Sequence, residues 1–396
     1  MKLSKKAEAL AASLTLEITA KANEMKKQGI DVVSFGAGEP DFNTPNYIKE
    51  AAIKAINDNH TRYTATSGIS ELKKAIVNKF KKDNGLEYSE DQILVSTGAK
   101  QSLANVFAAI LNDGDEVLIN IPYWVTYPEL VKLNGGVPVF IETKKENSFK
   151  FTLKELEENC TDRTKAILIN SPNNPTGSVY SEEELRDIAE FAKKKDLIIV
   201  SDEIYEKLIY DNKKHISIAS LSEDAFNRTI VINGVSKTYA MTGWRIGYSA
   251  APREINKLMV NIQSHTTSNA NAIAQYAALA ALEGKDDEIK LMVKEFERRK
   301  NYMVESINNI DLLETLHPNG AFYVMVDISK IFGKEYNGKV IKGSMDFSKA
   351  ILDKEKVAVI PGIAFGNDNY IRLSYATSME NIEEGIRRIE KFIKSL

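Results

Sequence analysis

Residues 229–248 read TIVINGVSKTYAMTGWRIGY, an apolar run followed by a lysine among apolar neighbours. The β-branched residues 230–232 end at Asn233-Gly234, which predicts a buried strand and a turn. Apolar surroundings reduce the hydration of Lys237 and therefore favour its neutral, nucleophilic amine. Such an amine can form a Schiff base with a carbonyl compound. The alternative is a solvated lysine in a surface loop, so the rest of the chain has to decide.

The overall composition is that of a globular protein without a strong charge bias. The chain has 396 residues, of which 43% are hydrophobic and 27% are charged, and its net charge is -3. These values give no reason to expect binding to nucleic acid or to an anionic membrane surface. The length favours two domains.

The chain has one cysteine, Cys160, and four histidines that are far apart in the sequence. No internal disulfide can form, and no metal-ligand spacing is visible, so no metal site is predicted. There is no apolar core of a signal peptide and no apolar run long enough to span a membrane. The expected location is therefore the reducing cytoplasm.

Apolar strands alternate with amphipathic helices through the middle of the chain. Strands are predicted at 92–96, 116–120, 166–170, 197–201 and 230–233, with a single helix at 254–283 after them. This alternation predicts an α/β fold with a mostly parallel, doubly wound sheet in a large domain at 46–285. After residue 285 the order of strands and helices changes. We therefore expect a smaller, discontinuous α+β domain made of residues 1–45 and 286–396.

Unusual residues follow five of the predicted strands. In open α/β sheets, ligands bind beyond the carboxyl ends of the strands, so these residues are expected to share one site. A strand, a glycine and a helix start, as at 96–100, can bind phosphate, and an aromatic side chain can stack on a flat ring. A carboxylate can pair with a ring nitrogen, and a lysine can form an imine with an aldehyde. These groups together describe pyridoxal phosphate; they are Gly98, Ala99, Lys100, Trp124, Asn174, Asp202, Tyr205, Ser236 and Lys237, with Arg245 as a further phosphate ligand. Taken singly, Asp202 also fits a helix N-cap and Trp124 a core aromatic.

Eight segments give the chain a resemblance to a known family. It resembles class I pyridoxal-phosphate aminotransferases of fold type I, in particular the bacterial aspartate aminotransferase branch. The segments extend over essentially the whole chain; they are AGEPDF at 37–42, RYT at 62–64, TGAKQSL at 97–103, PYW at 122–124, SPNNPTG at 171–177, SDEIYE at 201–206, SKTYAMTGWRIGY at 236–248 and RLSYA at 372–376.

The resemblance implies a role for each matching residue around the cofactor. Lys237 would carry the cofactor as an internal aldimine, and Asp202 would bind the pyridine nitrogen. Asn174 and Tyr205 would bind the phenolic oxygen, while Trp124 stacks on the ring. The phosphate would lie at Gly98, Ala99, Lys100, Ser236 and Arg245, with Tyr63 reaching the phosphate of the neighbouring subunit in a homodimer that shares its sites. Gly234 departs from the family pattern, because many relatives have a phosphate-binding serine there.

The same resemblance implies how a substrate would bind. Arg372 would hold the substrate α-carboxylate through two parallel hydrogen bonds, helped by Gly38, Trp124 and Asn174. A cis Asn174-Pro175 bond is also expected. The positions that correspond to distal-carboxylate recognition are Ser13, Thr15 and Lys100.

The expected reaction is amino-group transfer from L-aspartate to 2-oxoglutarate, which gives oxaloacetate and L-glutamate by a ping-pong aldimine mechanism. Three alternatives remain open at this point. The chain could be an aminotransferase for aromatic amino acids, alanine or prephenate. It could be a pyridoxal-phosphate lyase, or a regulator that binds the cofactor without catalysis.

Overall fold

The structure is a computed structural model that describes residues 2–11 and 14–396. Its largest element is a seven-stranded sheet in the order β2-β8-β7-β6-β5-β3-β4. Strands β3, β4, β5, β6 and β7 run parallel, and β8 runs antiparallel to both β2 and β7. The mostly parallel sheet predicted from the sequence is therefore confirmed. The strands are β2 (Ile93–Ser96), β3 (Glu116–Ile121), β4 (Val137–Glu142), β5 (Thr164–Asn170), β6 (Ile198–Asp202), β7 (Thr229–Gly234) and β8 (Gly247–Ala250).

Helices cover both faces of this sheet, because alternate side chains of each buried strand point to opposite faces. Ala166 and Leu168 of β5 join the core beneath α5 and α10, whereas Ile167 and Ile169 join the core beneath α8. The helices of this part are α3 (Asn46–Asn57), α4 (Ser70–Lys79), α5 (Ala99–Ile110), α6 (Thr126–Leu133), α7 (Leu153–Asn159), α8 (Glu182–Lys194), α9 (Glu223–Arg228), α10 (Arg253–Thr266) and α11 (Ala272–Glu283).

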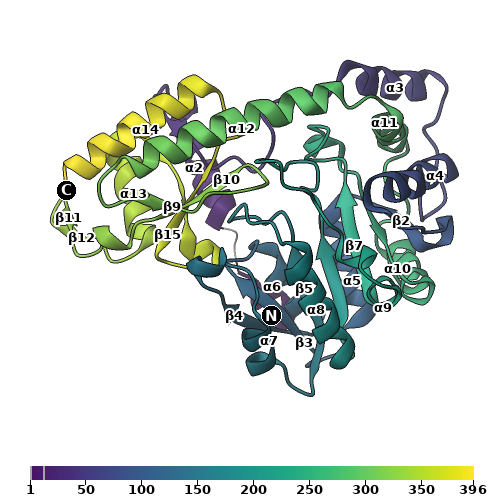
Figure 1. Cartoon of the computed structure of the whole chain (residues 1–396). Helices are drawn as coiled ribbons and strands as arrows, with labels where there is room; N and C mark the ends of the chain where they lie inside the picture. Colours follow the sequence, from purple (N-terminus) through teal and green to yellow (C-terminus); the bar gives the residue numbers. More distant parts are fainter. Residues whose placement is uncertain (1, 12–13) are drawn as a thin grey trace.

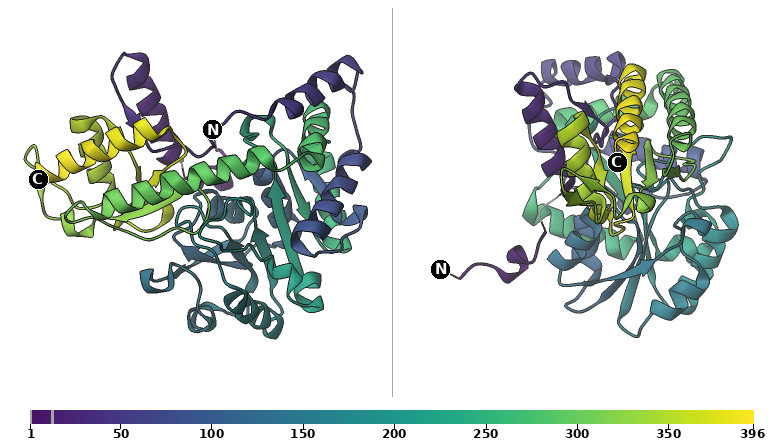
Figure 2. Two further views of the ribbon diagram at one scale, coloured as in Figure 1. Left: turned by 45° about the horizontal axis from the view of Figure 1, so that its top comes forward. Right: turned by 90° about the vertical axis from the view of Figure 1, so that its left-hand side faces the viewer.

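The second part of the molecule is built on a four-stranded sheet in the order β14-β15-β10-β9. Its helices lie on the left in Figure 1, where α12 and α14 run side by side. The two views of Figure 2 show the same arrangement from other sides. The elements are β9 (Glu314–Thr315), β10 (Tyr323–Asp327), β14 (Ile360–Pro361), β15 (Tyr370–Ser374), α12 (Asp287–Asn308), α13 (Ser344–Glu355) and α14 (Met379–Lys394), with a small hairpin of β11 (Glu335–Tyr336) and β12 (Lys339–Val340).

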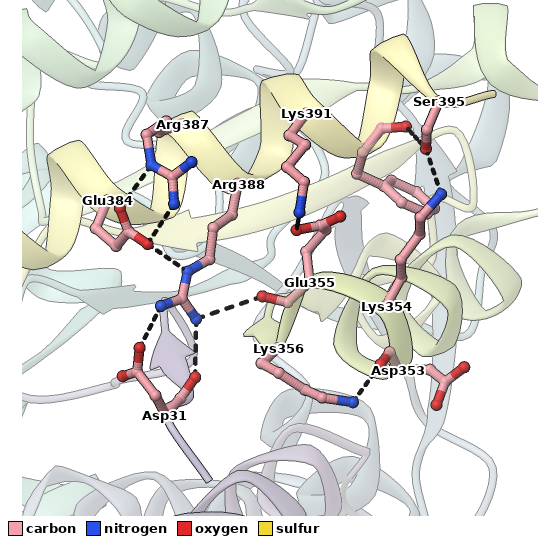
Figure 3. Close-up of polar contacts among 11 residues, drawn as sticks. Asp31, Asp353, Lys354, Glu355, Lys356, Glu384, Arg387, Arg388, Lys391 and Ser395 are labelled. Carbon is pink, nitrogen blue, oxygen red and sulfur yellow. Dashed lines mark hydrogen bonds and ion pairs between the residues drawn. The ribbon is translucent and has the colours of Figure 1, made fainter.

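Residues 14–34 of the N-terminal segment pack on this second part, whereas α1 (Lys5–Glu8) lies against α6 of the large part. Strand β1 (Val33–Ser34) pairs in parallel with β13 (Val357–Ala358). Arg388 of α14 binds the same segment, since it donates to the carbonyl oxygen of Asp31 at 2.8 Å and pairs with its carboxylate (Figure 3). The division into a large domain at 46–285 and a small domain at 1–45 and 286–396 stays our proposal, and these contacts support it.

Several elements differ from the sequence prediction. The near-helical spacing of Leu10, Leu14, Ile18 and Met25 predicts one helix at 4–28, but the structure has two separate helices, α1 (Lys5–Glu8) and α2 (Leu14–Lys27). The helix expected at 254–283 is also two helices, because Ser268 has a φ of 58° and the Asn271 side chain accepts a hydrogen bond from Ala274 N at the start of α11. Strands β4 and β8 were not predicted. Within the described ranges, no helix is both long enough and apolar enough to cross a membrane.

Candidate active site

A cavity of about 700 Å³ lies where the ends of the large-sheet strands face the second part of the molecule. Its walls come from segments that are far apart in the sequence. Among the described residues that line it, five side chains are cationic and two are carboxylates. This excess of positive charge favours an anionic ligand. The charged residues are Lys26, Lys100, Lys237, Arg245 and Arg372 on the one hand, and Glu39 and Asp202 on the other.

Lys237 reaches the cavity from the turn that follows β7. Its side chain is partly buried, and Nζ donates a hydrogen bond to the carbonyl oxygen of Gly38 at 2.5 Å. Burial lowers the pKa of Lys237 to about 8, and Arg245 and Arg372 act in the same direction, whereas Glu39 opposes them. Roughly a tenth of the amine is therefore neutral at pH 7, far more than for an ordinary lysine, and nucleophilic attack requires this form. Lys237 is therefore not the solvated surface-loop lysine that was the alternative from the sequence.

Asp202 is the last residue of β6 and is buried. Its carboxylate accepts hydrogen bonds from Tyr127 Oη at 2.8 Å and from the amide N of Ile204 at 3.2 Å. Both donors are neutral, so they do not balance a buried negative charge. Burial raises the pKa of Asp202 to about 6, although these two hydrogen bonds oppose the shift. The site therefore contains a carboxylate whose ionised form would gain from a cationic group in the cavity.

Asn174 connects this carboxylate strand to the arginine of the site. Its amide N donates to Asn170 Oδ1 at 2.9 Å, and its own Oδ1 accepts from Arg372 Nη1 at 2.9 Å. Asn170 Nδ2 in turn donates to the carbonyl oxygen of Asp202 at 3.0 Å. The Asn174-Pro175 bond is cis, as predicted.

Arg372 lies on β15 and is buried, although its guanidinium borders the cavity. The guanidinium centre is 4.2 Å from the ring centre of Tyr323 and 4.9 Å from that of Phe365. Nη2 donates to the carbonyl oxygen of Gly36 at 3.4 Å, while Nε is buried and has no partner in the part of the chain that the structure describes. A buried donor without a partner is unfavourable, so this guanidinium suits an added acceptor such as a carboxylate.

The N-terminus of α5 contributes another part of the cavity wall, since Ala99 and Lys100 line it. Gly98 has a φ of +80°, and a Cβ there would be 2.4 Å from Arg245 Nη2, so only glycine leaves room for this guanidinium. Lys100 Nζ lies 5.2 Å from the ring centre of Trp124, and burial together with Arg245 lowers its pKa. Helix amides, two cations and a close backbone approach are typical of a phosphate site.

Ser236 and Ala99 line the same cavity, but Gly234 does not. Gly234 pairs with Gly247 between β7 and β8, and a Cβ on it would be 3.0 Å from Gly247 Cα. The departure from the family pattern at position 234 therefore lies within the sheet. Within 234–237, Ser236 is therefore the hydroxyl that lines the cavity.

Four further predicted site residues differ in where they lie. Thr15, on α2, lines the cavity, as does Gly38. Tyr63 is not brought to this cavity, and its side chain is 91% exposed. Ser13 lies outside the described residues.

The sequence analysis missed several residues of the site. Tyr127 follows Trp124 by three residues at the start of α6 and packs edge-on against it, with ring centres 5.2 Å apart. Tyr323 lies on β10, and its hydroxyl is 3.1 Å from that of Tyr205. Asn170 ends β5, and its position at a strand end was a signal that could have identified it. Glu39 accepts a hydrogen bond from Thr242 Oγ1 at 2.6 Å.

Beside Asp202, a group of ligating side chains lies close enough together to hold a metal ion among the residues described here, namely Glu203, Glu206 and His215. Each carboxylate already has protein donors. Glu203 binds His215 Nε2 at 2.8 Å and Ser217 Oγ at 2.7 Å, and Glu206 pairs with Lys79. We therefore describe this group as a buried ionic cluster.

Comparisons with known proteins agree with this geometry. The sequence pattern of the family described as "Aminotransferase class I and II" matches residues 30–389. An aspartate aminotransferase from Bacillus sp. (strain YM-2) is 50% identical over 99% of both chains. The solved structure of an aspartate aminotransferase from Rhizobium meliloti has a TM-score of 0.96 at 42% identity and covers 100% of this chain and 99% of its own. That of Thermus thermophilus aspartate aminotransferase with maleate has a TM-score of 0.94 at 39% identity and covers 99% and 100%.

These similarities extend over the whole chain and include the segments that contribute to the cavity. The resemblance to the bacterial aspartate aminotransferase branch and the predicted fold are therefore confirmed. The chain belongs to the class I and II aminotransferases and is an aminotransferase enzyme.

Proposed function

We propose that this protein is an aspartate aminotransferase that moves an amino group from L-aspartate to 2-oxoglutarate and uses pyridoxal 5'-phosphate. The observation that carries the proposal is that Lys237, Asp202 and Arg372 line one cavity, although they come from three separate segments. Two relatives that are 50% and 49% identical to this chain are named aspartate aminotransferase, which supports the choice of substrate.

The residues of the cavity fit the proposed cofactor. The amine of Lys237 has a lowered pKa, so it can hold an aldehyde covalently. Asp202 is a buried carboxylate with two neutral donors and would hold a proton at a ring nitrogen. Arg245 and the start of α5 would hold a phosphate, and Trp124 offers a flat face for a ring. Asn174 and Tyr205 would bind the phenolic oxygen.

When bound, pyridoxal phosphate supplies an electron-withdrawing ring that stabilises negative charge at the α-carbon of the substrate. The protein supplies orientation and proton transfer. Arg372 would bind the α-carboxylate, with its unpartnered Nε as one donor. Lys237 lines the same cavity, and its neutral Nζ would take up the α-proton of the substrate as general base.

The preference for a dicarboxylic substrate would come from the other side of the cavity. Lys100 and Thr15 both line it, and Lys100 provides a partly buried cation. We propose that these two residues, together with Ser13, bind the distal carboxylate. The Thermus thermophilus relative was solved with maleate, a four-carbon dicarboxylate like aspartate, which supports this choice.

Lys100→Ala should therefore lower kcat/KM for aspartate about 30-fold or more, because a charge-assisted hydrogen bond to the substrate is lost. The loss with alanine, which has no distal carboxylate, should be several-fold smaller. Thr15→Val should show the same preference with a smaller effect. Equal losses with the two substrates would contradict distal-carboxylate recognition and assign Lys100 to the phosphate alone.

We propose in addition that the active protein is a cytoplasmic homodimer with shared sites. The family resemblance implies the homodimer, and Tyr63, which is 91% exposed in the single chain, is accessible to a neighbouring subunit. In the dimer it would reach the phosphate of the neighbouring subunit.

The proposed function is tested by adding amino acids, one at a time, to the cofactor-loaded protein and following the visible absorbance of the cofactor. Aspartate and glutamate should convert it fastest, and 2-oxoglutarate should reverse the change. A faster reaction with aromatic amino acids, alanine or the amino acid formed from prephenate would contradict the substrate assignment. Release of ammonia or pyruvate without an amino acceptor would indicate a lyase instead.

A further inference from the structure

Tyr323 is a buried tyrosine that touches two different groups of the proposed site. It lies on β10, which pairs antiparallel with β15 so that Tyr323 faces Ser374 and Met325 faces Arg372. Tyr323 and Arg372 are therefore diagonal neighbours, a spacing that long and aromatic side chains can bridge. Tyr323 is only 1% exposed.

The ring of Tyr323 packs against the Arg372 guanidinium. The guanidinium centre lies 4.2 Å from the centre of this ring and 4.9 Å from that of Phe365. Cation–π contacts with two rings restrict how the guanidinium can turn. Asn174 and Gly36 accept hydrogen bonds from Nη1 and Nη2, and Nε has no partner among the described residues. The ring thus helps to fix the orientation in which Arg372 can meet a carboxylate.

The hydroxyl of Tyr323 reaches the second group. It lies 3.1 Å from Tyr205 Oη, and both side chains are buried. Burial, together with Tyr323, keeps the pKa of Tyr205 well above its ordinary value, so Tyr205 stays a donor. A phenol has one proton. If Tyr205 donates that proton to the phenolic oxygen of the cofactor, the hydrogen bond between the two tyrosines must be donated by Tyr323. A hydroxyl that accepts a hydrogen bond is a stronger donor in turn.

We infer that Tyr323 is a positioning residue with two separable parts: its ring orients Arg372 for the substrate carboxylate, and its hydroxyl strengthens the hydrogen bond from Tyr205 to the cofactor. This inference rests on the proposed function and adds a residue that acts through two others. The Tyr323 side chain contacts both Arg372, which would bind the substrate carboxylate, and Tyr205, which would bind the cofactor.

Two substitutions separate the parts. Tyr323→Phe keeps the ring and removes the hydroxyl, whereas Tyr323→Leu removes both. Tyr375→Phe is the matched control, because Tyr375 is equally buried and donates to the carbonyl oxygen of Ala321 at 3.2 Å without lining the cavity. The measurements are the dissociation constant of maleate, the pH midpoint of the cofactor absorbance change, and KM and kcat for aspartate.

Tyr323→Leu should raise the dissociation constant of maleate and KM for aspartate about 10-fold, as expected for a lost desolvated cation–π contact. Tyr323→Phe should change both by less than about 2-fold, because the ring is retained. It should nevertheless raise the pH midpoint of the absorbance change by roughly 0.3 unit, because a weaker hydrogen bond from Tyr205 stabilises the deprotonated cofactor less. Tyr375→Phe should change neither quantity.

The inference is overturned if Tyr323→Phe weakens maleate binding as much as Tyr323→Leu, or if it leaves the midpoint unchanged. It is also overturned if Tyr375→Phe shifts the midpoint equally. Should Tyr323→Leu fail to fold, Phe365→Leu removes the second ring that contacts Arg372 and should likewise lower the affinity for maleate. A wild-type protein without a pH-dependent cofactor absorbance would instead overturn the proposed function, and this inference with it.

Discussion

Lys237→Ala is expected to lower kcat for amino-group transfer about 10⁴-fold, the largest effect of any single substitution in this chain. Two functions are lost together, because the same amine would hold the cofactor and remove the α-proton of the substrate. Its Nζ is held at the carbonyl oxygen of Gly38, and it lies 5.8 Å from the ring centre of Phe322.

Lys237→Arg is the matched variant, because it keeps a positive charge at the same position. A guanidinium stays protonated and cannot act as a base, so this variant should be as inactive as Lys237→Ala. Steady-state rates and the visible absorbance of the loaded protein give the measurement, with circular dichroism as the control for folding. Ordinary turnover in either variant, together with a cofactor absorbance that still shifts with pH, would show that the assignment of Lys237 is wrong.

The cavity could be predicted from the sequence to the extent that strand ends could be recognised. Parallel strands bring their carboxyl ends to one edge, so residues that follow separate strands meet in space. Asp202 and Asn174 were identified in this way, and so was Lys237 after β7. The cavity that these residues line confirms that reasoning, whereas their individual roles remain proposals.

Residues that support the site from inside other elements could not be found in this way. Tyr127 and Tyr323 lie in apolar stretches where an aromatic side chain is first read as part of the core. Their hydroxyls matter because each meets a particular polar atom, the carboxylate of Asp202 and the hydroxyl of Tyr205. Such pairings depend on the register and packing of distant segments.

The missed strand β8 has a similar cause. Gly247 begins it, and glycine weakens a strand signal. A Cβ at Gly247 would lie 2.2 Å from the amide N of Ala99, so this glycine is needed where β8 passes the start of α5. The close approach also brings Arg245, two residues earlier, to Gly98. Gly247, which weakens the strand signal in the sequence, therefore also contributes to the proposed phosphate site.

Asp202→Asn should cause the second-largest loss of catalysis. The same substitution should increase the stability of the cofactor-free protein. Asparagine has nearly the same shape and can keep both hydrogen bonds, with Oδ1 accepting from Ile204 N and Nδ2 donating to Tyr127 Oη. It cannot hold a proton at a ring nitrogen, so kcat should fall about 10³-fold, which corresponds to about 4 kcal/mol of transition-state stabilisation.

The cofactor-free protein should become more stable through the same substitution. The folded-state pKa of Asp202 is about 6, against an ordinary value of 3.8, so the folded protein keeps a proton that the unfolded chain releases. Stability must therefore fall as the pH rises from about 4 to about 6, and the loss persists above this range. Asparagine does not titrate and removes this loss.

Urea unfolding of the two cofactor-free proteins at pH 4.5 and pH 7.5 measures the difference. The advantage of Asp202→Asn in the free energy of unfolding should grow by about 2 kcal/mol between the two pH values. Addition of pyridoxal phosphate should reverse the order, because the ionised carboxylate then has a cationic partner and the wild-type protein gains more from binding. The wild-type protein could instead be the more stable one at pH 7.5 without cofactor. That result would contradict the inference that the buried Asp202 carboxylate destabilises the cofactor-free fold.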